Sequence, residues 1–230
     1  MIKKAVIYGH SQAQPTGMGD DLLHGLKLRG YSVQRLGLHG KNDAQLFASV
    51  GKLGDVSKAD RVYLYLGGNS SKPTVSDILK LIQYFGAYRT TVILSPVNLS
   101  LPPTEVSKKR AKMKGNRDGI SHLVPVYTVE AYANSFQPDG AHLLPKTPIS
   151  KALVAAMLDD PDPKGGHFTE DPAAVDPEPE KDTQQSSYSS DGKDATDQAV
   201  VAETEESGSS VLLFFVLAAV AAFLLARRRR

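Results

Sequence analysis

Short apolar runs alternate with segments of helical period along the first 158 residues of this 230-residue chain. This alternation is typical of βαβ units, in which helices cover both faces of a mostly parallel sheet. The sequence therefore predicts a three-layer α/β/α sandwich with a mostly parallel five-stranded sheet. The predicted strands are residues 3–8, 32–36, 61–66, 91–95 and 122–127.

Four segments between and after these strands have the period of a helix, namely 18–29, 43–50, 74–85 and 149–158. The first places Leu22 and Leu26 on one face and ends before Gly30, and the third ends before Gly86. Glycine directly after the last periodic residue is a common helix C-cap. We expect the functional loops of such a fold at the carboxyl ends of its strands.

The net charge of +2 conceals regions of opposite sign. Residues 1–158 hold 20 bases and 10 acids, whereas residues 159–210 hold 15 acids and three bases. One domain of about 150 residues can bury a sizeable core, so we assign residues 1–158 to a single folded domain. The acidic Pro- and Ser-rich stretch has little apolar surface to offset its ordering entropy, which predicts a disordered linker over 159–210.

Residues 211–226 are uninterrupted apolar residues and are followed by four arginines, 227–230. The pattern predicts a single-pass transmembrane helix that anchors the chain in a lipid bilayer by its C-terminus. The positive-inside rule places the arginines in the cytoplasm, but the N-terminus shows no export signal. A tail anchor inserted after synthesis, a bacterial surface-sorting signal and a viral membrane protein all fit. The side of the membrane, cell envelope or virion, stays open.

The chain contains no cysteine. This excludes disulfides, zinc-thiolate sites, iron–sulfur clusters and thiol nucleophiles. No group of His, Asp or Glu has convincing metal-ligand spacing, so we expect neither a metal nor another cofactor.

Four polar islands lie at predicted strand ends or before the last predicted helix. They read Gly-His-Ser-Gln at 9–12, Leu-His-Gly-Lys at 38–41, Gly-Gly-Asn-Ser at 67–70 and Asp-Gly-Ala-His-Leu at 139–143. In this order and placement the chain resembles the SGNH (GDSL-like) hydrolase family, whose four blocks contribute Ser, Gly, Asn and an Asp-x-x-His pair. The resemblance covers residues 3–158 and implies a serine esterase.

The resemblance implies a role for each island that is also chemically reasonable. A serine hydroxyl is a weak nucleophile until a base removes its proton, and His142 is the candidate base for Ser11. Asp139, three residues before His142, can orient the imidazole. The N–H groups of Ser11 and Gly40 and the side-chain amide of Asn69 would form an oxyanion hole.

Two positions depart from the family pattern. His10 stands where the first block normally has Asp, and Ser70 follows Asn69 where the third block usually has Asp. The second block is ambiguous, because Gly37 lies only three residues before Gly40.

Six bases fall within residues 108–117, and they are Lys108, Lys109, Arg110, Lys112, Lys114 and Arg117. One interpretation is a solvated helix face. Another is a binding surface for polyanions such as acidic glycans or anionic lipid head groups. Interleaved aromatic residues are absent, so we predict no specific nucleic-acid partner.

These observations predict a membrane-anchored serine esterase or deacylase that forms an acyl-enzyme on Ser11, with an O-acetyl group on a glycan as the favoured substrate. A second hypothesis is a flavodoxin-like mononucleotide-binding module, because residues 8–19 follow the first strand and open a helix. A third is a non-catalytic protein of this fold on a cell or virion surface, which the departures at His10 and Ser70 support.

Overall fold

A sheet of seven parallel-paired strands forms the centre of the protein, and the computed structural model describes residues 2–159 and 164–170 of it. The strands are β1 (Lys3–Gly9), β2 (Tyr31–Gly37), β3 (Arg61–Leu66), β4 (Thr90–Leu94), β5 (Val97–Asn98), β6 (Val126–Ala131) and β7 (Gly166–Thr169). The α-helices of the described residues are α1 (Gly19–Leu28), α2 (Asp43–Phe47), α3 (Val75–Phe85), α4 (Pro103–Ile120) and α5 (Pro148–Asp159).

The strands follow the order β2-β1-β3-β4-β6, and every pair along this path is parallel. The short β5 pairs with the end of β6 beyond β4, and β7 pairs with β6 as well. The predicted α/β fold with a mostly parallel sheet is therefore confirmed. The predicted number of five strands is wrong, because β5 spans only two residues and β7 lies in a segment without an apolar run.

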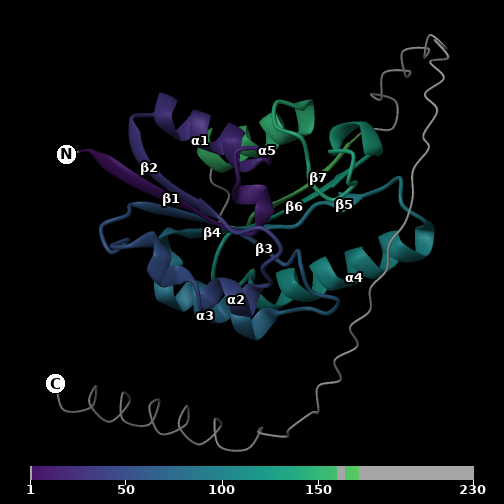
Figure 1. Cartoon of the computed structure of the whole chain (residues 1–230), viewed down its shortest axis with the longest axis horizontal. Coiled ribbons are helices and arrows are strands. Elements are labelled where there is room, and N and C mark those ends of the chain that lie inside the picture. Colours follow the sequence, from purple (N-terminus) through teal and green to yellow (C-terminus); the bar gives the residue numbers. More distant parts are fainter. Residues whose placement is uncertain (1, 160–163, 171–230) are drawn as a thin grey trace, which may run out of the picture. The chain divides into compact units, whose positions relative to one another are not determined.

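Helices cover both faces of the sheet, as Figure 1 shows. On one face α1 and α5 pack on Ala5 and Ile7 of β1, whereas α2, α3 and α4 lie on the other face against Val6 and Tyr8. Successive residues of β1 are thus buried on opposite sides, which is the pattern of a strand covered on both faces. This arrangement fixes the carboxyl ends of β1, β3 and β4 at one edge of the sandwich.

The region before β6 differs from the prediction. A strand was expected over 122–127, but β6 begins at Val126, and residues 121–123 form a turn after α4. Helix α4 buries Val106, Met113 and Ile120, which are seven residues apart, and is otherwise mostly polar. With one buried apolar residue every seven positions, this 18-residue helix lacks the apolar period by which a helix is predicted from sequence.

Strand β7 corrects the predicted start of the linker. Gly165 has a φ of 73°, and a Cβ atom there would lie 1.9 Å from the carbonyl oxygen of Val126. Phe168 stacks on Tyr127 with the ring centroids 6.3 Å apart, and the Glu170 carboxylate accepts the Tyr132 N–H at 2.8 Å. Residues 164–170 therefore complete the sheet edge, although their composition resembles that of a disordered segment.

The remainder of the predicted linker, the predicted membrane helix at 211–226 and the arginine tail at 227–230 lie outside the described residues. Among the helices of residues 2–159 and 164–170, none is long and apolar enough to cross a bilayer. Membrane anchoring therefore stays a prediction from the sequence.

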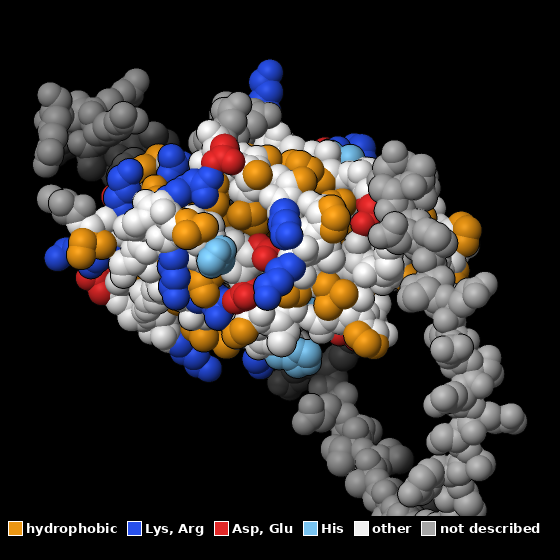
Figure 2. All heavy atoms as spheres, turned by 90° about the horizontal axis from the view of Figure 1, so that it is seen from above, with side chains coloured by type: hydrophobic (Ala, Val, Ile, Leu, Met, Phe, Trp, Pro, Cys, Tyr) orange, Lys and Arg blue, Asp and Glu red, His pale blue; other side chains and the backbone are white. Residues whose placement is uncertain are grey.

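The excess of bases in the folded part is not confined to one helix. Figure 2 looks down on the side that carries α1 and α5 and shows Lys and Arg side chains spread over it among acidic and apolar ones. The charge around a candidate site therefore depends on the particular residues that line it.

Candidate active site

Ser11 lies directly after β1, at the start of a short 3₁₀ turn (Ser11–Ala13), and is buried. The chain enters this turn through Gly9, where a Cβ atom would lie 2.1 Å from the carbonyl oxygen of Tyr65 on β3. Only glycine fits this close approach of two strand ends. The backbone before Ser11 is further held by a hydrogen bond from the His10 N–H to Tyr65 O at 3.1 Å.

Three predicted catalytic residues meet at this point. The Oγ atom of Ser11 is hydrogen-bonded to Nε2 of His142, which lies 131 positions further along the chain. The Nδ1 atom of His142 contacts Oδ2 of Asp139. Asp139 Oδ1 accepts the N–H groups of Ala141 at 2.9 Å and of His142 at 3.1 Å. The predicted Ser, His and Asp thus form one continuous hydrogen-bonded network.

The environment of Asp139 keeps its carboxylate ionised. Partial burial by itself would raise the pKa of Asp139, but the Ala141 N–H and the ring and N–H of His142 outweigh burial and lower it. A carboxylate that accepts the Nδ1–H of an imidazole leaves Nε2 as the acceptor. His142 is therefore oriented to accept the proton of the Ser11 hydroxyl.

Two side chains that the sequence did not single out hold the loop between Asp139 and His142. The Gln12 amide donates to the carbonyl oxygen of Ala141 at 3.2 Å, and the Asn98 amide donates to that of Gly140 at 3.1 Å. Gln12 follows Ser11 and Asn98 lies on β5, so the loop is tied to the ends of two strands. Their role depends on which strands are neighbours, which a sequence pattern does not reveal.

The predicted oxyanion-hole residues are only partly assembled. Asn69 lines the same pocket as Ser11 and His142, although its side-chain amide donates one N–H to the carbonyl oxygen of Lys41 at 2.9 Å. Gly40 is not among the pocket-lining residues, but the ring of the preceding His39 stacks on His142 with the centroids 6.2 Å apart. Within residues 2–159 and 164–170, the N–H groups of Ser11 and Gly40 have no hydrogen-bond partner.

His10, which stands where Asp was expected, is buried and lines the same pocket as Ser11. Its Nδ1 accepts the Gln12 N–H at 3.3 Å, so the proton resides on Nε2, which lies 2.8 Å from Ser95 Oγ and 3.3 Å from Leu66 O. Burial lowers the pKa of His10 to about 4. His10 is therefore a neutral hydrogen-bond donor at the floor of the pocket.

Buried Asp43 and half-buried Lys112 hold the loop that carries Asn69. Asp43 accepts the Gly67 N–H at 3.0 Å and contacts the Thr74 hydroxyl, and the Lys112 ammonium donates to the carbonyl oxygens of Gly68 and Ser70 at 3.0 and 2.8 Å. Burial raises the pKa of Asp43 and lowers that of Lys112. The sequence placed Lys112 only in a basic run and did not identify Asp43.

The six bases of 108–117 do not form one uniform surface. Arg110 forms a two-point ion pair with Glu130, with N···O distances of 2.8 and 2.6 Å. Lys114 contacts Asp118, and Arg117 lies 3.8 Å from it. Lys109 and Lys112 line the Ser11 pocket, whereas Lys108 is exposed and lines neither that pocket nor the one beside it. Polyanion binding by the whole run stays a prediction.

No side-chain group within the described part of the chain could hold a metal ion with three or more His, Asp or Glu ligands.

The similarity of this chain to known proteins lies in its fold. No family model and no curated protein matches the sequence. Among solved structures, a lipase/acylhydrolase from Enterococcus faecalis has a TM-score of 0.50 and 18% identity, covering 68% of this chain and 94% of that chain. The two chains share a fold. A family 3 carbohydrate esterase from Clostridium thermocellum has a TM-score of 0.48 and 17% identity, over 68% and 96% of the two chains.

Proposed function

We propose that this chain is a serine hydrolase that cleaves an acyl ester through a covalent acyl-enzyme on Ser11. The observation that carries the proposal is the network from Ser11 Oγ to His142 Nε2 and from His142 Nδ1 to Asp139. A nucleophile, a base and a group that orients the base are the parts that acyl transfer needs. The shared fold with a protein described as a lipase/acylhydrolase supports the same reaction class.

The first half of the reaction forms the acyl-enzyme. His142 Nε2 takes the hydroxyl proton of Ser11 while Oγ attacks the ester carbonyl carbon, and the carbonyl π electrons move to the oxygen. The N–H groups of Ser11 and Gly40 and the free amide N–H of Asn69 stabilise this oxyanion. When the carbonyl re-forms, the C–O bond to the alcohol breaks, and the alcohol leaves with the proton from His142.

The second half repeats these steps with water. His142 removes a proton from water, the hydroxide oxygen attacks the acyl carbon, and the acid leaves as Ser11 regains its proton. Asp139 stabilises the imidazolium that forms in each half-reaction and stays ionised throughout. Water is the co-reactant of the second half-reaction, so that the ester and water become an acid and an alcohol.

The size of the pocket favours a short acyl group. The cavity beside Ser11 has a volume of about 100 Å³, well below the roughly 300–1,000 Å³ of sites that enclose drug-sized ligands. The substrate we propose is an acetyl ester on a glycan. The predicted membrane helix at 211–226 would hold the enzyme near a bilayer. The small cavity supports a short acyl group, and the sequence alone supports the glycan and the bilayer.

Labelling by a fluorophosphonate probe tests the nucleophile. We expect the full-length protein to label and to hydrolyse 4-nitrophenyl acetate, and Ser11→Ala to lose both. Ser107→Ala, which alters an exposed serine on α4, is the matched control and should label like the wild type. Equal labelling of Ser11→Ala and wild type, or no labelling of the wild type, would refute the assignment.

A mononucleotide-binding function has less support. A phosphate loop needs free N–H groups, yet those of Ala13, Gln14 and Gly17 donate to carbonyl oxygens of the same loop. The Asp139–His142 pair would also have no role. A non-catalytic protein of this fold is separated from the enzyme by the same labelling experiment.

A further inference from the structure

A second, larger pocket lies beside the Ser11 pocket. It has a volume of about 380 Å³, and both pockets are lined by Ser95 and Met113. Ser95 is the residue whose hydroxyl contacts His10 at the floor of the first pocket. The two cavities are therefore neighbours that share a wall, within reach of one bound molecule.

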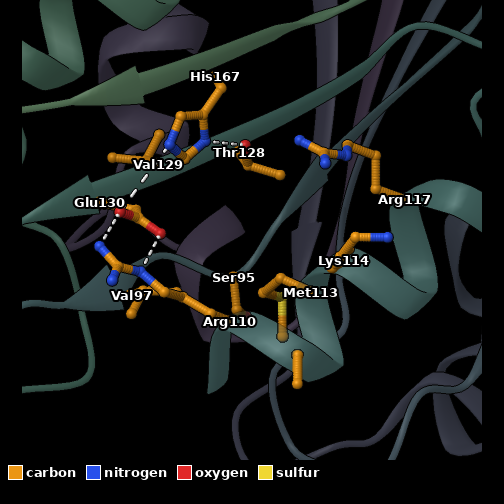
Figure 3. Close-up of a pocket in the computed structure, with 11 residues that line it drawn as sticks. Ser95, Val97, Arg110, Met113, Lys114, Arg117, Thr128, Val129, Glu130 and His167 are labelled. Atoms are coloured by element: carbon orange, nitrogen blue, oxygen red, sulfur yellow. Dashed lines mark hydrogen bonds and ion pairs between the residues drawn. The ribbon is translucent and has the colours of Figure 1, made fainter. Parts of the chain in front are cut away.

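The second pocket combines apolar and basic walls, which Figure 3 shows at close range. Val97 of β5 and Met113 of α4, which belong to the apolar cluster on the α4 side of the sheet, supply apolar surface. Arg110, Lys114 and Arg117 of the same helix supply three positive charges.

Glu130 is the single acid that lines this pocket in the described part of the chain, and it would not repel a bound anion. Glu130 is buried, and Arg110 neutralises it with two charged hydrogen bonds of 2.8 and 2.6 Å. His167 of β7 lies 3.9 Å from Glu130 and is held by Thr128 at 2.6 Å. Within residues 2–159 and 164–170, the two bases at the other end, Lys114 and Arg117, pair only with the exposed Asp118.

The charge of the first pocket has the same sign. Lys109 and Lys112 line it, and no Asp or Glu of the described part of the chain does. Among the described residues, five bases and one acid line the two pockets, and the pairing of Arg110 with Glu130 leaves four positive charges there. Clefts lined by one sign of charge concentrate ligands of the opposite sign.

We infer that the second pocket receives an anionic group, a carboxylate or a phosphate, carried by the substrate whose ester lies at Ser11. A short apolar stretch of that substrate lies along Met113 and Val97, and the anion lies at Lys114 and Arg117. The inference rests on the proposed ester hydrolysis for the reacting end of the molecule. The binding of the anion itself does not.

Two esters that differ in charge, and two double variants that each lose two positive charges, test whether hydrolysis favours an anionic substrate. 4-Acetoxybutanoate, whose acetyl group suits the small Ser11 pocket and whose carboxylate lies on the alcohol side of the ester, is compared with its primary amide, which has the same length without the charge. We expect wild type to prefer the anionic ester, and Lys114→Gln/Arg117→Gln to lower the ratio of kcat/KM values about fivefold, mainly through KM. Lys27→Gln/Lys80→Gln removes two charges from helices outside both pockets and should keep the ratio.

Glutarate and inorganic phosphate test binding without any reaction. Each is titrated into the full-length protein while the ring resonances of His167 are followed by NMR, and we expect saturable shifts that the Lys114→Gln/Arg117→Gln variant loses. The stronger of the two ligands identifies the anion class. A protein that binds either anion but hydrolyses neither ester would disprove the proposed function and retain the anion site.

The converse results overturn the inference. Hydrolysis of both esters at equal rates, an unchanged ratio in Lys114→Gln/Arg117→Gln, or an equal drop in the control variant would show that the pocket does not select an anion. Failure of both anions to shift His167 in the wild type would exclude the site itself, whatever the hydrolytic activity.

Discussion

The Nε2 atom of His10 lies 2.8 Å from Oγ of Ser95, which joins the loop after β1 to the residue after β4. Because His10 Nδ1 accepts the Gln12 N–H, the imidazole uses both nitrogens while neutral. Protonation would add a second N–H where the Gln12 N–H already points. The contact therefore makes the floor of the site dependent on a neutral histidine.

Acidification should destabilise the protein through His10. Burial lowers its pKa from an ordinary 6.5 to about 4, so the unfolded chain binds more protons between these values and stability falls as the pH decreases through this window. The shift corresponds to about 3 kcal/mol of unfolding free energy lost between pH 7 and pH 4. Urea unfolding as a function of pH measures it.

His10→Asn is the comparison for that measurement, since an amide can donate and accept at this position without titrating. Between pH 7 and pH 4, the unfolding free energy of His10→Asn should fall by about 3 kcal/mol less than that of the wild type. Parallel curves for the two proteins would show that His10 does not titrate with unfolding.

Asp139→Asn should lower kcat for ester hydrolysis by about 10²- to 10⁴-fold, because an amide cannot stabilise the His142 imidazolium or fix its tautomer. Asp55→Asn is the matched control, since Asp55 also accepts a backbone N–H two residues on, from Ser57 at 2.9 Å. Steady-state kinetics of ester hydrolysis give kcat for both variants. A kcat for Asp139→Asn within threefold of the control would rule out the assigned role.

Asn69→Ala should reduce kcat by about 10²- to 10³-fold with a smaller change in KM, since it removes a donor to the oxyanion. Asn134→Ala, at an exposed asparagine outside the pocket, serves as the control. An equal, small effect of both substitutions on kcat would mean that the Asn69 amide serves only to hold Lys41.

Gly165→Ala should detach β7. The new Cβ would lie 1.9 Å from Val126 O, in addition to the penalty of a φ of 73°. Gly30→Ala has a similar φ of 78° with nothing within 4 Å of the added Cβ, so it isolates the backbone penalty of about 1–2 kcal/mol. Hydrogen exchange of the β6 and β7 amides should accelerate in Gly165→Ala and not in Gly30→Ala. Unchanged protection in Gly165→Ala would contradict the observed packing.

The parts of the site that could be predicted are those in short islands next to strand ends. Ser11, Asp139 and His142 were predictable because the parallel fold brings such ends to one edge. Ser95 and Asn98 were not, since an isolated polar residue acquires its role only from strand neighbours, and Gln12 lay in an island without a predicted role.

The same limit applies to the fold. The apolar period predicted β1 and β3 and the helices around them, because these elements are buried along most of one face or both. Strand β7 escaped detection because Phe168 is its one large apolar residue, and the packing of Gly165 against Val126 leaves no pattern.

The late position of β7 in the chain has a consequence for how the protein is made. A chain leaves the ribosome N-terminus first, at about 5–20 residues per second. Every other strand is complete by residue 131, but the outer edge of β6 has no neighbour until residues 166–169 emerge. During that interval the nascent chain exposes an unpaired strand edge, the feature most prone to pair with another chain. Molecular chaperones would therefore have their greatest effect on this protein at the end of its synthesis.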